Sequence, residues 1–217
     1  MVVWDLPLRI YHWLLMLCVI LAFITSEWDD RSFHQFFGMS VLGLCCFRII
    51  WGFIGSPSAK FVNFVKPPRI FFSYLIRMIK RDTGTMAGHS PVGGWASIVL
   101  IFITSWLALT GSLSNDDILF DGPFAHLLPS LSDLASELHE NTKLILIGVV
   151  LMHLGALFFY RFWLGKNLVP AMIQGSRDDK TGPGGKISLL HTALGLGVLV
   201  CCLAAAYFAI LIKPSFF

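Results

Sequence analysis

The chain has 217 residues, of which 56% are hydrophobic and only 13% are charged, whereas soluble proteins carry about 25% charged residues. This composition excludes a typical soluble domain, a disordered chain, a collagen and a secreted disulfide scaffold. The formal net charge of +3 at pH 7 is too small to indicate a nucleic-acid partner.

Five apolar stretches predict an all-α integral membrane helix bundle. They cover residues of about 10–26, 34–54, 92–113, 141–164 and 188–212. A helix needs ~20 apolar residues to cross ~30 Å of hydrocarbon. We interpret the first stretch as a retained span and not as a signal peptide, since it lacks a leading basic cluster and a small-residue cleavage site.

The segments between these stretches alternate in charge and predict the topology. Residues 55–91 and 162–187 are rich in lysine and arginine, whereas 27–33 and 114–138 are mainly acidic. Basic loops stay in the cytoplasm, so we expect a cytoplasmic N-terminus and a C-terminus on the outer side. The run from Arg69 to Arg81 follows two prolines and mixes basic with apolar residues, which predicts a helix lying on the inner leaflet.

Four histidines are predicted to lie in the spans at two depths. His34 and His139 open the second and fourth spans at the outer side, while His12 and His153 lie in the inner half. His153 follows His139 by fourteen residues, so their side chains share one helix face within about 40° and lie about 21 Å apart. Ionisable residues within spans are costly and indicate function.

Two opposed imidazoles at each depth are what six-coordinate haem iron requires. Neutral imidazole is a strong iron ligand, and helix bundles hold such cofactors in their cores. The pattern therefore predicts an outer haem between His34 and His139 and an inner haem between His12 and His153. The alternative is that each histidine only forms a hydrogen bond to a neighbouring helix. The five cysteines lie in apolar runs without a C-x-x-C or C-x-x-C-H motif, so zinc and covalently attached haem are not expected.

Three cations are candidates for binding the haem propionates. Arg48 lies fourteen residues after His34, on the same helix face and at the predicted depth of the inner haem. A buried arginine needs an anion, and a guanidinium binds a carboxylate with two hydrogen bonds. The alternative is that Arg48 snorkels to the cytoplasmic surface. Arg9 and Lys143 are further candidates, at the inner and outer haem respectively.

The other three histidines have less defined roles. His126 lies in the acidic outer segment and is expected to be solvated, while His191 is a reserve ligand for the inner haem. His89 precedes the third span, where it would either line a quinone pocket or order the loop. Ser90 is expected to cap that helix and Pro91 to occupy its first turn.

Several motifs together resemble one known family, the bacterial di-haem b-type cytochromes of the cytochrome b561 and nickel-iron hydrogenase cytochrome b group. The resemblance covers roughly residues 3–175. It is carried by Val3-Trp4-Asp5-Leu6-Pro7, Arg9-Ile-Tyr-His12-Trp13, His34-x-x-x-Gly38, Phe47-Arg48, Gly88-His89-Ser90-Pro91-x-Gly93-Gly94, Leu138-His139-Glu140, Met152-His153 and Asn167-Leu-Val-Pro-Ala-Met-Ile173.

The resemblance implies a bacterial inner-membrane protein with two b haems, ligated by the residues that match His12, His34, His139 and His153. It implies electron exchange with membrane quinone, and a periplasmic redox partner such as a c-type cytochrome or a hydrogenase small subunit. In this organisation residues 1–175 form a four-helix di-haem core, 176–187 a flexible linker and 188–217 an additional span. Ser90 stands where the family more often has asparagine, which leaves the role of that loop open.

Two other functions stay open on the sequence. Some relatives in this group oxidise superoxide at the outer haem and reduce ubiquinone, which would require positive charge near that haem to attract an anion. The outer segments here carry nine acidic residues against Arg31 and Lys143, which argues against that reaction. A membrane anchor without redox activity, in which the histidines only form hydrogen bonds, is the other alternative.

Overall fold

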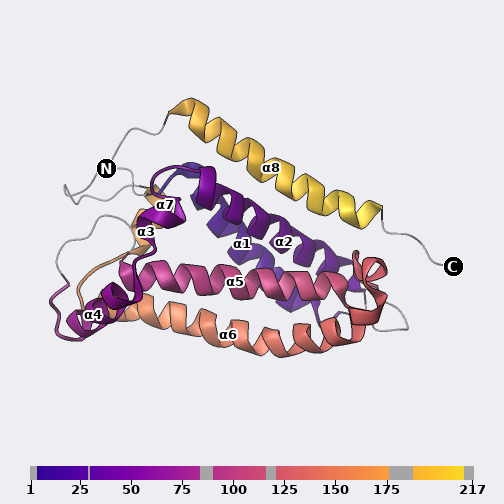
Figure 1. The fold of residues 1–217 in the computed structure, drawn as a ribbon, viewed down its shortest axis with the longest axis horizontal. Helices are drawn as coiled ribbons and strands as arrows, with labels where there is room; N and C mark the ends of the chain where they lie inside the picture. The colour runs from indigo at the N-terminus through magenta and orange to yellow at the C-terminus, as the bar shows by residue number, and fades with distance from the viewer. Residues whose placement is uncertain (1–3, 29, 84–89, 116–120, 176–187, 213–217) are drawn as a thin grey trace. The chain divides into compact units, whose positions relative to one another are not determined.

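The computed structural model describes residues 4–28, 30–83, 90–115, 121–175 and 188–212. Five long helices lie within these ranges (Figure 1): α1 Leu6–Thr25, α2 Arg31–Ile54, α5 Pro91–Leu113, α6 Ser132–Phe162 and α8 Leu189–Leu211. Each is long and apolar enough to cross a membrane. The predicted all-α integral membrane helix bundle is therefore confirmed.

Shorter helices lie in the connecting segments. They are α3 Phe61–Phe64, α4 Pro68–Ile79 and α7 Val169–Gln174, with two 3₁₀ turns at Ala125–Leu127 and Pro129–Leu131. The helix predicted for residues 69–81 is confirmed as α4. Pro67 is its N-cap and Pro68 occupies its first turn, where the missing N–H costs nothing and the fixed φ favours the helix.

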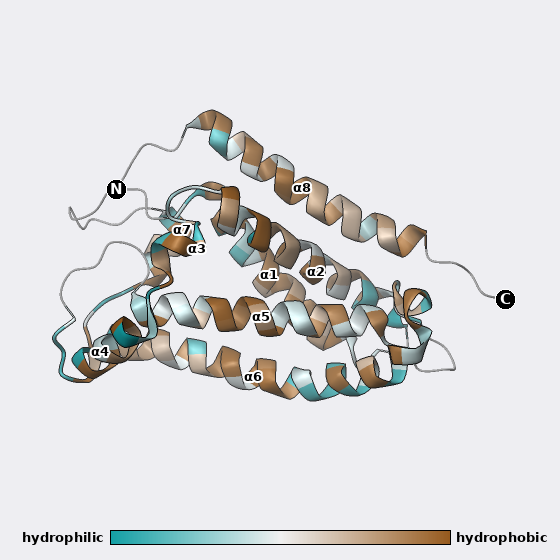
Figure 2. Ribbon diagram, in the orientation of Figure 1, coloured by the Kyte–Doolittle hydropathy of each residue, from teal (hydrophilic) through white to brown (hydrophobic). Residues whose placement is uncertain are grey.

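The bounds of two long helices differ from the prediction. The first helix begins at Leu6 instead of residue 10, because Asp5 caps it: its Oδ1 accepts a hydrogen bond of 2.7 Å from the Leu8 backbone N–H. The fourth begins at Ser132, nine residues before the predicted start at 141. Its first turns are polar (Figure 2), so the apolar stretch in the sequence starts later than the helix does. His139 therefore lies two turns inside α6 and does not open it.

The chain divides into two compact units. Unit 1 comprises Met1–Ile10, Ile49–Leu100 and Gly148–Leu196, and unit 2 comprises Tyr11–Arg48, Ile101–Ile147 and Gly197–Phe217. Each of the five long helices contributes residues to both units.

Unit 1 is stabilised by the hydrogen bonds of a buried carboxylate and by a hydrophobic cluster. Asp5 is 1% exposed, and its Oδ2 accepts hydrogen bonds from Trp51 Nε1, at 3.0 Å, and from the Ser56 hydroxyl. Tyr74 and Met78, one turn apart on α4, pack against Tyr160 of α6. This hydrophobic cluster packs α4 against the end of α6.

Unit 2 has its core along α2. Half of the most apolar stretch of α2 is buried, against 11–17% in the other long helices. Val41 and Cys45 of α2 pack with Ala108 of α5. α8 approaches α2 closely, since a Cβ on Gly43 would lie 2.9 Å from the Cys202 carbonyl oxygen. Small residues allow such close contact between membrane helices.

Candidate functional site

Two of the predicted ligands lie side by side in unit 2. The imidazole rings of His34 on α2 and His139 on α6 have centroids 6.1 Å apart, with an interplanar angle of 78°. His34 lies in the first turn of its helix and His139 in the third turn of its own, so both belong to the same end of unit 2.

Backbone carbonyls of two further helices orient both rings. His34 Nδ1 lies 2.8 Å from the carbonyl oxygen of Ala22 on α1, and His139 Nδ1 lies 2.9 Å from that of Leu107 on α5. A carbonyl oxygen only accepts, so each Nδ1 carries the proton in these bonds and each Nε2 presents a lone pair. This is how metal-binding histidines are usually held.

The two rings line a cavity of about 290 Å³. Its walls are apolar deeper in the unit, where Val19, Val41 and Leu146 line it, and it is charged near the helix ends. Gly38 lies one turn after His34 and also lines the cavity, and a Cβ there would meet no atom within 4 Å. The absent side chain therefore adds open space beside the histidine.

The donor set and the space fit a haem iron. Metal–imidazole bonds are about 2 Å long, so two imidazoles that bind one iron from opposite sides have ring centres roughly 6 Å apart. The separation of 6.1 Å between His34 and His139 matches that value. The porphyrin brings the remaining four nitrogen ligands itself, and an apolar wall with one open glycine face suits its flat surface.

The charged residues at the mouth of this cavity are already engaged. Lys143 Nζ lies 2.7 Å from Glu140 Oε1. Arg31 donates a hydrogen bond from Nη1 to the Ser26 carbonyl. Lys143 nevertheless lines the cavity together with both histidines, as its predicted role requires.

The predicted inner ligands fall in different units. His12, half-buried on α1, belongs to unit 2 and contacts the ring of Trp13 edge-on, at 5.4 Å between centroids. His153, half-buried on α6, belongs to unit 1. Their pairing stays a prediction.

Arg48 and Arg9 have defined surroundings. Arg48 is 3% exposed in unit 2, so its side chain lies inside the protein and does not reach the surface as the snorkelling alternative requires. Arg9 donates a hydrogen bond of 2.6 Å to the carbonyl oxygen of Ile173, near the end of α7. Its Nε is buried without a hydrogen-bond partner in the described part of the chain.

The remaining histidines lie apart from the cavity. His126 is exposed, as expected. His191 of α8 contacts the Trp51 ring, at 5.2 Å between centroids, and its Nε2 is buried without a hydrogen-bond partner among the described residues. His89 lies outside the described residues. The predicted cap is confirmed, because Ser90 Oγ accepts a hydrogen bond of 3.1 Å from the Gly93 N–H and Pro91 begins α5.

Sequence reasoning missed one glycine that positions a predicted ligand. A Cβ on Gly111 of α5 would lie 2.7 Å from His139 Cε1 and 2.8 Å from its Nδ1. Only glycine leaves room for that ring in its present position. Gly111 is near the end of an apolar helix, and its sequence context gives no sign of the imidazole that packs on it.

Comparison with known proteins identifies the family. The family model described as prokaryotic cytochrome b561 matches residues 3–175, which include α1 to α7 and leave α8 outside. No curated protein and no solved structure matches the chain at a significant level. The chain belongs to the prokaryotic cytochrome b561 family and is a membrane b-type cytochrome of electron transfer that binds haem b.

Proposed function

We propose that this cytochrome passes electrons between a periplasmic redox protein and membrane quinone through two b haems. The observation that carries the proposal is the placement of His34 and His139, whose rings lie 6.1 Å apart with both Nδ1 atoms on backbone carbonyls. The outer haem is assigned to this pair. The inner haem is assigned to His12 and His153 from their shared depth in the sequence.

The protein supplies ligation, orientation and a dry surrounding. A bound haem supplies the one-electron chemistry. His34 and His139 would hold the iron through Nε2, while the carbonyls of Ala22 and Leu107 accept the Nδ1 protons and keep both rings correctly turned. The apolar cavity wall excludes water, which raises the cost of a change in charge and so affects the reduction potential.

Propionate binding is assigned to the cations nearest each predicted haem. Lys143 lines the outer cavity, and Arg48, which is buried in unit 2, is assigned to the inner haem from its depth in the sequence. A guanidinium can bind a carboxylate with two hydrogen bonds. Arg9 is the further candidate at the inner haem.

The charge around the outer cavity favours a protein donor over superoxide. Glu27 and Glu140 line this cavity together with Arg31 and Lys143, so acidic side chains offset the positive charge that would attract a small anion. The acidic outer segments favour a partner with a basic face, such as a c-type cytochrome or a hydrogenase-like small subunit. Stopped-flow measurements should show that the rate of reduction by a basic donor cytochrome falls steeply as salt is added. Reduction by superoxide that is faster than reduction by the cytochrome would contradict the choice of a protein donor.

Haem content of single variants tests the ligand assignment. His34→Ala and His139→Ala should each lose the outer haem and keep the inner one, while His12→Ala and His153→Ala should do the reverse. Pyridine haemochrome assays count the haems, and a redox titration distinguishes the two centres. The matched control is His126→Ala, an exposed histidine in a 3₁₀ turn, which should keep both haems.

The outcomes of this test are distinct. Loss of the same single haem in all four variants would refute the pairing by depth. A colourless wild-type protein would refute the di-haem assignment as a whole, and would favour an anchor without redox activity.

We also propose the bacterial inner membrane as the location, with the N-terminus in the cytoplasm and the C-terminus in the periplasm. The basic segments on either side of α5 and α6 support this orientation. Alkaline phosphatase fused after residue 217 should be active in cells, because the enzyme folds only outside the cytoplasm. If the fusion after residue 217 is inactive and a second fusion, placed after α7, is active, the orientation is the reverse of the proposed one.

A further inference from the structure

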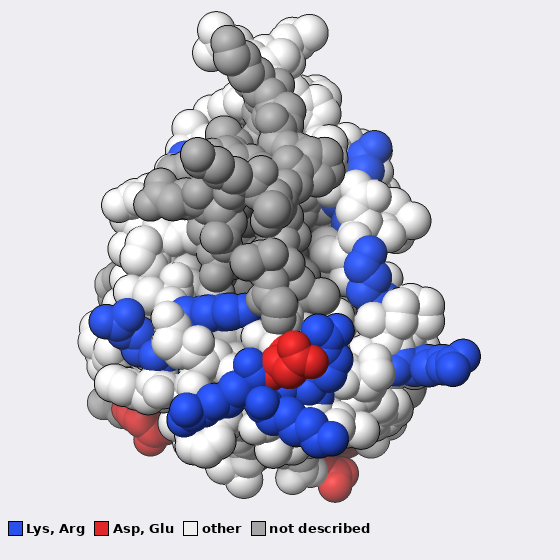
Figure 3. Space-filling view, turned by 90° about the vertical axis from the view of Figure 1, so that its left-hand side faces the viewer, with Lys and Arg blue, Asp and Glu red and all other residues white. Residues whose placement is uncertain are grey.

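The end of α4 in unit 1 carries a cluster of cations whose role the electron-transfer function does not explain. The basic cluster consists of Arg77, Lys80, Arg81 and Lys166. Among the described residues one acidic side chain, Asp82, lies with them, which gives four positive charges against one negative in that part of the chain. Lysine and arginine side chains gather on the face shown in Figure 3, where acidic side chains are few.

The backbone holds Arg81 in an unusual conformation. Its φ of 59° is the left-handed value that favours glycine. The Asp82 N–H bonds to the Arg77 carbonyl at 2.9 Å and the Arg81 N–H to the Met78 carbonyl at 3.3 Å, which is the Schellman ending of a helix. A non-glycine residue pays roughly 1 kcal/mol for this conformation, and such strain is found where the surrounding structure fixes the side chain.

The surrounding structure fixes the Arg81 side chain. Its guanidinium carbon lies 4.0 Å from the centroid of the Trp163 ring, which follows α6. A cation over an indole ring is stabilised by about 0.5–1 kcal/mol at an exposed site. The ring occupies one face of the guanidinium and leaves its N–H groups along the edge available to an anion.

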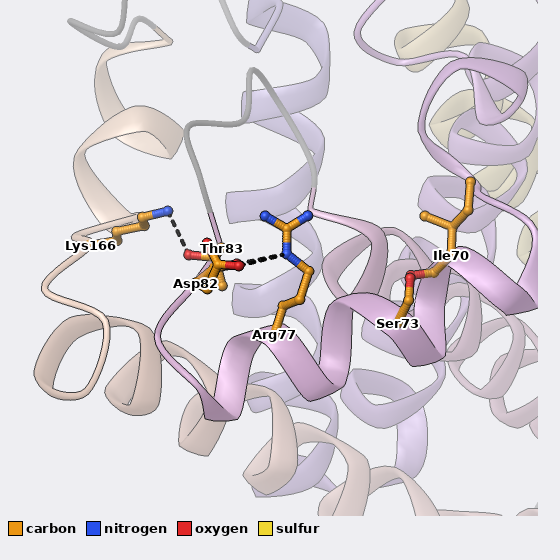
Figure 4. Close-up of polar contacts among 6 residues, drawn as sticks. All are labelled: Ile70, Ser73, Arg77, Asp82, Thr83 and Lys166. Atoms are coloured by element: carbon orange, nitrogen blue, oxygen red, sulfur yellow. Dashed lines mark hydrogen bonds and ion pairs between the residues drawn. The ribbon is translucent and has the colours of Figure 1, made fainter.

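The neighbouring cations are also held in place (Figure 4). Arg77 Nε donates a hydrogen bond of 2.8 Å to the Asp82 carbonyl oxygen, and its terminal nitrogens point away from that contact. Lys166 Nζ donates to Thr83 Oγ1 at 2.9 Å, which holds its ammonium group beside Asp82 and Thr83. The Arg77–Asp82 ion pair is largely exposed and contributes little by itself.

An apolar surface lies beside the cations. At 100° per residue, Phe72, Ile76 and Ile79 occupy one face of α4 within about 60° of each other, roughly 100° from Arg77 and Lys80. These three side chains are 56–64% exposed. The third face of α4, with Tyr74 and Met78, packs on α6 and keeps the helix in position.

Next to this face, the end of α6 adds two exposed aromatic residues. Phe162 is 77% exposed and Trp163 is 45% exposed. Tryptophan is enriched where hydrocarbon meets water. Fixed cations beside an exposed apolar surface therefore match a ligand that has an anionic head and apolar chains.

We propose that the basic cluster is a binding site for the phosphate of an anionic phospholipid, whose acyl chains lie against the exposed apolar face of α4 and the end of α6. The cluster holds the phosphate by charge-assisted hydrogen bonds from fixed side chains. A soluble anion would not account for the adjoining apolar surface. Basic sites between membrane helices bind anionic lipid head groups in this manner.

The test compares two variants of the full chain that lose the same number of positive charges. The cluster variant carries Arg77→Gln, Lys80→Gln and Arg81→Gly, where glycine suits the left-handed backbone and protects the fold. The control variant carries Lys60→Gln, Lys66→Gln and Arg69→Gln, cations of the same unit outside the cluster. Each protein is placed in phosphatidylcholine nanodiscs that contain 5% phosphatidylglycerol, and native mass spectrometry counts the phosphatidylglycerol that stays bound.

The expected result separates a built site from general attraction to a charged surface. A cation that contacts a bound anionic head group contributes a factor of about five to its binding, whereas a cation away from the head group contributes less. The cluster variant should lose at least tenfold in its preference for phosphatidylglycerol over phosphatidylcholine, and the control variant less than threefold. Equal losses in the two variants, or no loss in the cluster variant, would overturn the proposal. Circular dichroism should give the same helix content for all three proteins. If the cluster variant fails this check, it is replaced by Arg81→Gly alone, which should lose at least threefold in its preference for phosphatidylglycerol.

Discussion

Replacing Gly111 by alanine should loosen the outer haem without touching either of its proposed ligands. The new Cβ would lie 2.7 Å from His139 Cε1, whereas ordinary contact begins near 3.4 Å. The ring must therefore retreat by about 0.7 Å, the difference between these values. The clash is with the ring and not with the flexible end of a long side chain, so it cannot be relieved cheaply.

The size of the effect follows from the bond that the retreat breaks. His139 Nδ1 lies 2.9 Å from the Leu107 carbonyl oxygen, and a shift of 0.7 Å away from it would bring the pair to about 3.6 Å, beyond hydrogen-bond length. Loss of such an orienting partner costs about 10–100-fold in metal affinity. Gly111→Ala should therefore release the outer haem 10–100 times faster.

Haem transfer to an excess of apomyoglobin measures that rate directly. The wild-type protein and Gly111→Ala are compared with Gly148→Ala, a control on α6 whose exposed glycine has no atom within 4 Å of an added Cβ. Only one kinetic phase of Gly111→Ala should accelerate, since the inner haem is unaffected. A transfer rate within twofold of wild type would refute the reasoning that links Gly111 to the ligand.

Three further changes have outcomes that the structure predicts. Asp5→Ala should lower the free energy of unfolding by about 2–4 kcal/mol in detergent, because it removes the cap of α1 and leaves the buried Trp51 N–H unpaired; an unchanged unfolding midpoint would contradict the network. Gly38→Leu should leave the helix content of the haem-free protein unchanged, because the new side chain enters open space. It should reduce the haem content, because that space belongs to the cavity, and two retained haems would show that the cavity does not hold the porphyrin. Tyr160→Phe should lower the unfolding midpoint by a few degrees, because it removes the 2.7 Å hydrogen bond to Ser90, whereas an unchanged midpoint would show that water replaces the hydroxyl.

Hydropathy predicted the five spans because lipid exposure requires an apolar surface on every crossing. It failed at the start of α6, where Ser132 to Glu140 form helix from polar residues. Hydropathy reports the solvent around a segment, while helix formation depends on backbone hydrogen bonds and capping. The two measures separate wherever a helix continues past the hydrocarbon into water.

The depth of the outer histidines could be predicted, but their supports could not. His34 lies in the first turn of α2 and His139 in the third turn of α6, and each stands close to the start of its apolar stretch, so hydropathy brings them to one end of unit 2. The carbonyls of Ala22 and Leu107 depend on which turn of α1 and α5 faces each ring, and that is decided by the rotation of the packed helices. Main-chain acceptors occur at every position and leave no mark in the sequence.

The main-chain origin of those two acceptors has a consequence for how this cytochrome tolerates change over evolutionary time. Every amino acid carries a carbonyl oxygen, so no point substitution at positions 22 or 107 deletes the anchor of either imidazole. A side chain at either position can change, within the limits that the adjoining cavity sets, without removal of the carbonyl. The tautomer of each ring therefore depends on the backbone positions of α1 and α5. A substitution changes it only if it displaces one of these helices.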